Sequence, residues 1–176
     1  QVVPWGGISS ILRMDVFLMQ YDDMIEFGLR NPLLGFQAIN IGDTDIRGIE
    51  FSALGDYKVR GVSGDFLLSY TYIDPTYRNF DEDIQARSSV DENILKYRVR
   101  HQLTLQSSWN RGPWQLGLSG LYNSDMVAVD ALLELFVIPE LQTYRASNAG
   151  AFWRWDVSLG YVWENWRGMG EVGDIF

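Results

Sequence analysis

The chain has 176 residues, of which 47% are hydrophobic and 21% charged, and its formal net charge is −9 at pH 7. This composition is typical of a folded domain, and the acidic balance argues against nucleic acid as a partner, because phosphate binding needs a basic face. The chain has no cysteine and a single histidine, His101, which excludes a disulfide framework and leaves little for a metal site. We therefore expect no metal and no cofactor.

Two further features narrow the class of protein. The sequence lacks the run of roughly 18 apolar residues that a transmembrane helix needs. The N-terminus has no signal-peptide pattern, so we expect the chain to begin inside a longer protein or after processing. Aromatic residues make up 14% of the chain, and their positions discriminate between the possible architectures.

Apolar and polar residues alternate along most of the chain, which is typical of β-strands with two different faces. The first strand is less regular, because Phe17 and Met19 share the parity of Arg13 and Asp15. In the sixth strand the large apolar residues from Trp153 to Trp163 fall on one parity. We expect strands over residues 10–28, 44–58, 64–74, 97–109, 113–124, 152–163 and 168–176.

The expected connections differ in length on the two sides of these strands. Short, glycine-bearing segments that suit tight hairpins occupy residues 59–64, 110–113 and 164–168. Long links over residues 29–43, 75–96 and 124–151 join the other ends. This pattern predicts an all-β, antiparallel meander with short turns at one end and long loops at the other.

A soluble sandwich and an outer-membrane barrel would both alternate in this way, but the aromatic residues favour the barrel. Tryptophan and tyrosine prefer the lipid headgroup zone, and charges in mid-strand, at Asp65, Arg154 and Asp156, suit an aqueous lumen. We expect lipid-interface contacts from the aromatic residues of the apolar parity, which are Tyr70, Tyr72, Trp109, Trp114, Tyr122, Trp153, Trp155, Tyr161 and Trp163.

Four segments carry a family resemblance. They are residues 14–26 (MDVFLMQYDDMIE), 40–51 (NIGDTDIRGIEF), 95–105 (LKYRVRHQLTL) and 154–176 (RWDVSLGYVWENWRGMGEVGDIF). In this order and spacing they resemble the C-terminal half of a TonB-dependent outer-membrane receptor barrel. The resemblance implies that residues 1–176 form a partial barrel domain, with about seven strands of a family-typical 22, and that the plug domain lies elsewhere.

The resemblance also implies a function and partners. It implies uptake of a scarce nutrient (a siderophore-iron chelate, cobalamin, a glycan or a peptide) across the Gram-negative outer membrane, driven by inner-membrane energy through the TonB complex. Short turns would face the periplasm and long loops the outside. The implied partners are outer-membrane lipid, the rest of the barrel and a plug domain. The alternative is a non-transporting barrel that acts as a scaffold or docking partner in a larger assembly.

Charged residues on the polar parity are the candidates for substrate binding in the lumen. Inward arginines hold anionic groups well, but we favour their pairing with lumen acids such as Asp65, since a barrel interior needs local charge balance. The candidates are Arg98, Arg100, Arg154, Asp156 and Glu50.

Other chemistry is weakly indicated. The serines at 107, 108 and 119 have no base near them in the sequence, so we expect no enzyme activity. We expect His101 to pack at the outer rim on the apolar parity. The apolar segment 127–141 suggests a flap that caps a ligand, docks a surface lipoprotein or packs on itself. Acidic clusters, which we interpret as solvated surface rather than Ca²⁺ or Mg²⁺ sites, occur at Asp22-Asp23, Asp43/Asp45, Asp81-Glu82-Asp83 and Asp91-Glu92.

Overall fold

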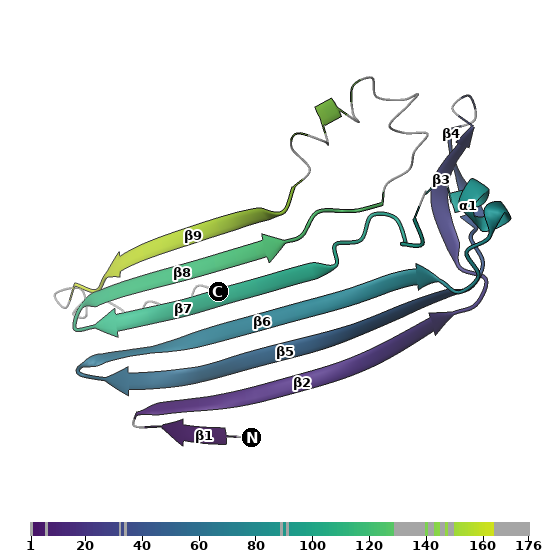
Figure 1. Cartoon of the computed structure of the whole chain (residues 1–176). Coiled ribbons are helices and arrows are strands. Elements are labelled where there is room, and N and C mark those ends of the chain that lie inside the picture. Colours follow the sequence, from purple (N-terminus) through teal and green to yellow (C-terminus); the bar gives the residue numbers. More distant parts are fainter. Residues whose placement is uncertain are drawn as a thin grey trace, which may run out of the picture.

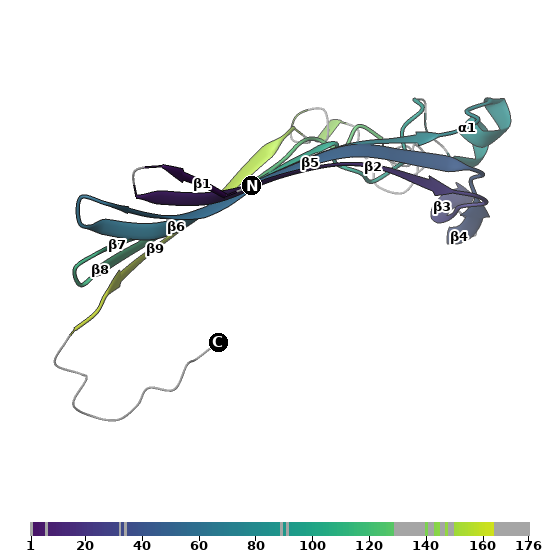
Figure 2. The same ribbon diagram turned by 90° about the horizontal axis from the view of Figure 1, so that it is seen from below.

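The protein forms one long, curved antiparallel sheet (Figures 1 and 2). The computed structural model describes residues 2–5, 7–31, 33, 35–88, 90, 92–128, 140, 143, 144, 147 and 150–163. The sheet order is β1-β2-β5-β6-β7-β8-β9. Its strands are β1 (Val2–Trp5), β2 (Ile8–Tyr21), β5 (Thr44–Val59), β6 (Val62–Tyr77), β7 (His101–Arg111), β8 (Trp114–Asn123) and β9 (Phe152–Tyr161). This topology confirms the all-β antiparallel meander.

Tight turns close one end of the sheet, which we call the hairpin end. Arg60 and Gly61 both have positive φ values, 51° and 79°, between β5 and β6. Two such residues in a two-residue turn match the right-handed twist of the flanking strands. Gly112, with φ 56°, turns the chain between β7 and β8. The opposite end, which we call the loop end, carries the longer connections.

Several predicted boundaries are wrong, for identifiable reasons. The first long strand ends at Tyr21 rather than at residue 28, because Asp23 has a positive φ of 51°. The fourth predicted strand begins at His101 rather than at residue 97, because Tyr97 has a φ of 58°. The strand β1 was not expected, and the predicted strand over residues 168–176 lies outside the described residues.

Two of the predicted long links contain regular structure. Residues 29–43 overlap a hairpin of β3 (Ile25–Asn31) and β4 (Gly35–Asn40), which forms a separate two-stranded sheet. The link after β6 contains the helix α1 (Glu82–Ser88), whose start is capped by the Asp81 carboxylate accepting a 2.8 Å hydrogen bond from the Ile84 amide. Both elements lie at the loop end (Figure 1). No helix among the described residues is long and apolar enough to cross a membrane.

The buried core lies at the loop end, where the connections fold onto the strands. Its members are Ile39, Ile41, Ile46, Tyr77, Val90, Ile94, Leu95 and Ala128, with Phe17, Met24, Ile73, Phe80 and Ile84 packed against them. Phe17 lies opposite Gly48, and a Cβ on that glycine would come within 2.2 Å of the phenyl ring. The irregular parity of Phe17 is therefore explained by this core, which needs an apolar side chain on the otherwise polar face.

Candidate functional site

The register of the strands places their apolar residues on a single face. Residues directly opposite in an antiparallel pair point to the same side. One continuous cross-strand row runs Met14, Phe51, Tyr70, Leu103, Tyr122, Trp153, and the next row runs Leu12, Ala53, Leu68, Leu105, Gly120, Trp155. We call this side the apolar face and the other the polar face.

The apolar face has aromatic residues toward both ends of the strands. At the loop end the rings of Tyr122 and Trp153 lie 5.0 Å apart, and at the hairpin end those of Trp114 and Tyr161 lie 4.8 Å apart. Along β9, Trp153 and Tyr161 bracket a stretch close to the roughly 9–11 residues that a tilted strand needs to cross a bilayer. The face thus has an apolar band between two aromatic zones, the arrangement of a membrane barrel.

The predicted interface aromatics fall within this arrangement. The register places eight of them on the apolar face, and the ninth, Trp163, lies beyond β9 with its ring 6.0 Å from that of Tyr161. The eight are Tyr70, Tyr72, Trp109, Trp114, Tyr122, Trp153, Trp155 and Tyr161. Between the aromatic zones the face is uncovered within the described structure, with Val157 70% exposed. A continuous apolar surface of this kind marks an interaction face.

His101 belongs to the aromatic zone at the loop end. Its Nδ1 lies 2.9 Å from the Tyr70 hydroxyl, and its ring centre is 5.0 Å from that of Tyr72. These contacts agree with interfacial packing for this residue. His101 is the only histidine of the sequence and lies on the apolar face, so the serines of the polar face have no imidazole beside them.

The polar face carries three of the five predicted lumen candidates. Glu50 lies directly opposite Asp15. Arg154 and Asp156, which are two residues apart on β9, form an ion pair of 3.4 Å, and Arg13 and Asp15 form another of 2.6 Å on β2. The Arg154–Asp156 and Arg13–Asp15 ion pairs each balance charge locally, as expected if inward arginines pair with acids of the lumen.

The other two candidates lie elsewhere, which corrects their predicted position within a strand. Arg98 and Arg100 both precede β7. The Arg100 guanidinium contacts the Asp74 carboxylate, donates to the Tyr72 hydroxyl at 3.3 Å, and lies 5.9 Å from the Tyr72 ring centre. Tyr72 and Asp74 have the apolar-face parity, so Arg100 belongs to the outer edge of that face.

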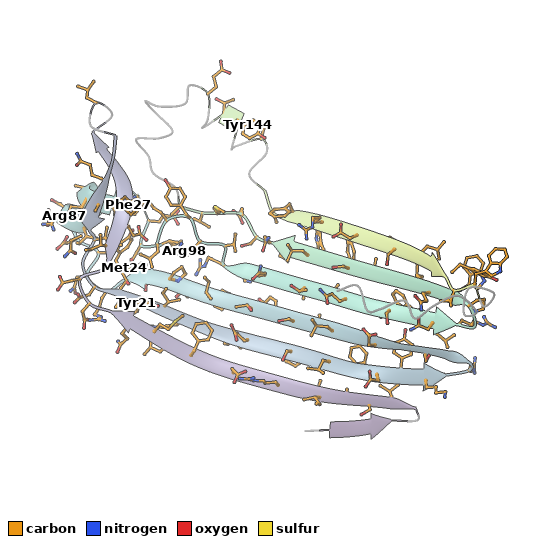
Figure 3. The ribbon with its side chains drawn as sticks, turned by 180° about the vertical axis from the view of Figure 1, so that it is seen from behind. Tyr21, Met24, Phe27, Arg87, Arg98 and Tyr144 are labelled. Carbon is orange, nitrogen blue, oxygen red and sulfur yellow. The ribbon has the colours of Figure 1, made fainter. Side chains whose placement is uncertain are left out.

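Arg98 lies at the loop end, as do Met24 and Phe27 (Figure 3). Its charge, with that of Lys96, acts on Glu26 in the β3–β4 hairpin. Burial raises the pKa of the Glu26 carboxyl, and the two cations oppose that rise. Arg98 therefore contributes to the electrostatics of the hairpin and does not join Glu50 and Arg154.

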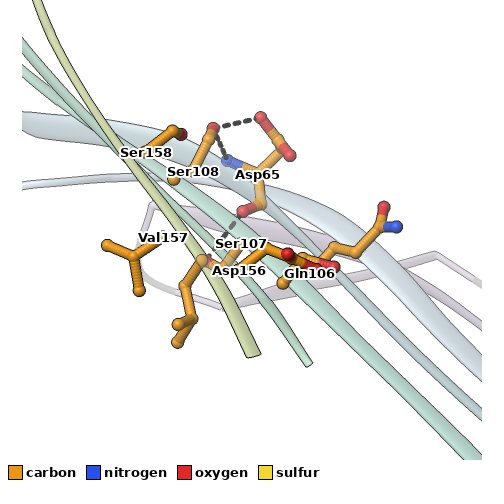
Figure 4. A pocket seen from close by; sticks show the side chains of 10 residues that line it. Asp65, Gln106, Ser107, Ser108, Asp156, Val157 and Ser158 are labelled. Carbon is orange, nitrogen blue, oxygen red and sulfur yellow. Dashed lines mark hydrogen bonds between the residues drawn. The ribbon is translucent and has the colours of Figure 1, made fainter. Parts of the chain in front are cut away.

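A groove of about 320 Å³ lies on the polar face over β6 to β9 (Figure 4). Ser108 donates to the Asp65 carboxylate, and Ser107 donates to the Asp65 carbonyl oxygen at 3.0 Å. Asp156 and Ser158 line the far side. The groove is lined by hydroxyl and carboxylate groups and suits water or a polar ligand.

Sequence reasoning missed the ion-pair cluster at the loop end. Arg78, which directly follows β6, pairs with Asp22 at 3.0 Å, Asp43 at 3.3 Å and Asp45 at 3.1 Å. These carboxylates raise the pKa of the Arg78 guanidinium by hydrogen bonding and by their charge. A guanidinium thus occupies the centre of the aspartates. Among the described residues, no group of three or more acidic or histidine side chains could hold a metal ion.

The structure describes the remaining acidic clusters and the apolar segment 127–141 only in part. Asp81 caps α1, and Asp83 pairs with Arg87 within that helix, so this acidic cluster supports the helix. Asp91 lies outside the described residues. Of the apolar segment 127–141, the structure describes residues 127, 128 and 140 only. Ala128 joins the loop-end core, and the rest of the predicted flap lies outside the described residues.

The in-register apolar face, its two aromatic zones and the charged opposite face define the wall of a membrane-spanning antiparallel barrel. The chain belongs to the family described as TonB dependent receptor-like, beta-barrel, whose model matches residues 2–172. This is a family of outer-membrane receptors and transporters. A search of curated proteins found none that matches the chain.

Proposed function

We propose that this chain forms part of the barrel wall of a TonB-dependent transporter that imports a scarce nutrient across the outer membrane. The nutrient classes are a siderophore-iron chelate, cobalamin, a glycan or a peptide. The observation that carries the proposal is the apolar face, kept in register across six long strands of a chain whose family is one of outer-membrane transport. Residues 1–176 then act as one partial barrel domain, completed by further strands and by a plug that couples to the TonB complex.

In this proposal the polar face lines the aqueous lumen. Glu50, Arg154 and Asp156 contact the plug or the passing ligand, and their position on the polar face supports this role. Arg98 lies at the loop end, which in this proposal is the outer entrance, where a cation would attract an anionic ligand. Arg100 is paired with Asp74 at the edge of the apolar face and does not share this role. The apolar-face aromatics contact lipid at the two membrane interfaces.

The proposal is tested by uptake measurements in cells. A strain that lacks the gene for the complete protein is compared with the complemented strain, using labelled compounds of the four nutrient classes. We expect loss of uptake for one class in the deletion strain, and loss of the same uptake in complemented cells when a protonophore dissipates the inner-membrane potential. Unchanged uptake of all four classes, with the protein present in the outer membrane, would favour the scaffold or docking role instead.

A further inference from the structure

The groove on the polar face over β6 to β9, which we call the polar groove, has the construction of a ligand site (Figure 4). Its two sides are neighbouring cross-strand rows of polar residues. The row between them, which contains Leu118 and Val157, belongs to the apolar face, so the floor of the groove is backbone. One side is formed by Gln106, Ser119 and Asp156, and the other by Asp65, Ser108, Gly117 and Ser158.

One end of the polar groove is held by its own hydrogen bonds. The register of β6 with β7 omits Gly64 and Asp65, and side chains connect the strands there instead. The Asp65 amide donates to the Ser108 hydroxyl at 3.4 Å, and the Ser107 hydroxyl donates to the Asp65 carbonyl oxygen at 3.0 Å. The Tyr57 hydroxyl donates to the Ser108 carbonyl oxygen at 2.6 Å. This end is therefore fixed before any ligand arrives, and most of its hydrogen-bonding capacity is used.

The rest of the polar groove has hydrogen-bonding capacity to spare. Within the described ranges, no hydrogen bond joins the side chains of Gln106, Ser119 or Ser158 to another residue. A carboxamide and a hydroxyl can each donate and accept. Asp156 uses its Oδ2 atom for Arg154, at 3.4 Å, which leaves Oδ1 as an acceptor. The groove thus offers donors and acceptors together, and none of the described residues that line it is a cation.

These features discriminate between the four nutrient classes. An anionic iron chelate needs arginine or lysine beside it, and the lining supplies neither. Cobalamin and most peptides present apolar surface, but the side chains of Leu118 and Val157 point to the opposite face. A sugar presents hydroxyls that both donate and accept, which matches the unused groups. The volume of about 320 Å³ lies at the small end of the roughly 300–1,000 Å³ of ligand sites.

We propose that the polar groove is a transit site for a neutral saccharide that passes through the barrel. This inference rests on the proposed transport function and selects the glycan class within it. The Gln106 carboxamide and the Ser119 and Ser158 hydroxyls bind sugar hydroxyls in exchange for water, and Asp156 accepts from another. Gln106, Asp156 and Ser158 are exposed, so binding is weak. Weak binding suits a site that must release its ligand onward.

Uptake by cells that produce the complete protein tests the proposal. The probes are radiolabelled maltotriose, xylotriose, cellotriose and triacetylchitotriose, and we expect import of at least one to require the protein. The double variant Ser119→Ala/Ser158→Ala should lower the maximal rate of that import about tenfold, the loss expected from two neutral hydrogen bonds. The matched control is Ser52→Ala/Ser69→Ala, a directly opposite serine pair on the polar face outside the groove, which should stay within about twofold of wild type.

A bulky side chain tests the same site sterically. Ser119→Trp fills the polar groove and should nearly abolish import, whereas Ser69→Trp places the same indole on the same face outside it and should leave import within about twofold. Saccharide binding to cells treated with a protonophore should stay near the wild-type level in both variants, because a transit site is not the site of capture. Rates are expressed per folded receptor, measured by heat-modified migration in gels.

Equal import by the wild type and Ser119→Ala/Ser158→Ala would overturn the proposal, as would equal losses from Ser119→Trp and Ser69→Trp. The proposal would also fail if an iron chelate, cobalamin or a peptide required the protein for import and no saccharide did. That result would leave the transport function intact. Import of no compound of any of the four classes would instead overturn the transport function, and this site with it.

Discussion

Gly120 of β8 lies directly opposite Trp155 of β9, and the indole ring covers the glycine so closely that a Cβ there would be 2.4 Å from it. Trp155 also stacks on Trp153, with ring centres 5.2 Å apart. The missing side chain at Gly120 therefore provides the space that lets the two indoles lie flat against the apolar face.

Gly120→Val should destabilise the barrel by displacing this indole. Overpacking a tightly filled site costs about 1–3 kcal/mol, so we expect a lower urea midpoint in detergent and a changed tryptophan emission. Gly150→Ala is the control, because a Cβ at Gly150 meets nothing within 4 Å. Equal midpoints for the two variants would show that the Trp155 ring moves aside without cost.

Arg78→Gln should loosen the loop end of the sheet. The substitution leaves Asp22, Asp43 and Asp45 close together without their shared cation. We expect severalfold faster limited proteolysis between residues 20 and 45, with little change at the hairpin end. Arg60→Gln, in the opposite β5–β6 turn, serves as the control. Proteolysis of Arg78→Gln at the wild-type rate would argue against a structural role for the cluster.

Glu26 should make the docking of the β3–β4 hairpin depend on pH. Burial raises the pKa of Glu26 above the ordinary value of 4.5. The Glu26 carboxyl therefore holds its proton more tightly in the folded hairpin than in the unfolded chain. The resulting stability is fully present below about pH 4.5 and is lost as pH rises through the folded-state pKa. Lys96 and Arg98 limit the effect, because both favour the ionised form.

The Glu26 effect is measured as hydrogen exchange of β3 and β4 against pH. Glu26→Gln should remove the part of the pH dependence that this carboxyl causes, and should protect the hairpin better than wild type at pH 7. Glu82→Gln, at the exposed start of α1, is the control for a carboxylate outside this site. Identical pH profiles for the wild type and Glu26→Gln would contradict the assignment.

Much of the sheet could be predicted from the sequence, because alternation directly reports which side chains share a face. The parities of Trp153 to Tyr161 and of Leu103 to Trp109 match the faces that the register defines. The exceptions arise from tertiary contacts. Phe17 breaks the pattern because it serves the loop-end core, and a one-dimensional pattern does not contain the connections that fold over it.

The boundaries and the charge cluster were harder to predict, because they depend on single backbone angles and on chain segments distant in sequence. Positive φ values at Asp23 and Tyr97 end the alternation where the residue types alone allow it to continue. The β3–β4 hairpin covers residues expected to form the end of the first strand, up to residue 28, and part of the long link 29–43. Its sequence (IEFGLRNPLLGFQAIN) contains two glycines and a proline, which give no clear alternation. The Arg78 cluster follows from the register of Tyr21 with Thr44, which brings the segments around Asp22 and Asp43 together.

The central claim is that the apolar face contacts lipid and the polar face contacts water, and adjacent residues of β9 test it directly. These 176 residues contain no cysteine, so single nitroxide labels can be attached at Val157→Cys and Ser158→Cys in the complete protein, with any cysteine outside this segment replaced by serine, after reconstitution in lipid bilayers. The account predicts that power-saturation electron paramagnetic resonance finds residue 157 accessible to oxygen and residue 158 to a water-soluble nickel chelate. Equal accessibility of both labels to the chelate, or the reverse assignment, would contradict it.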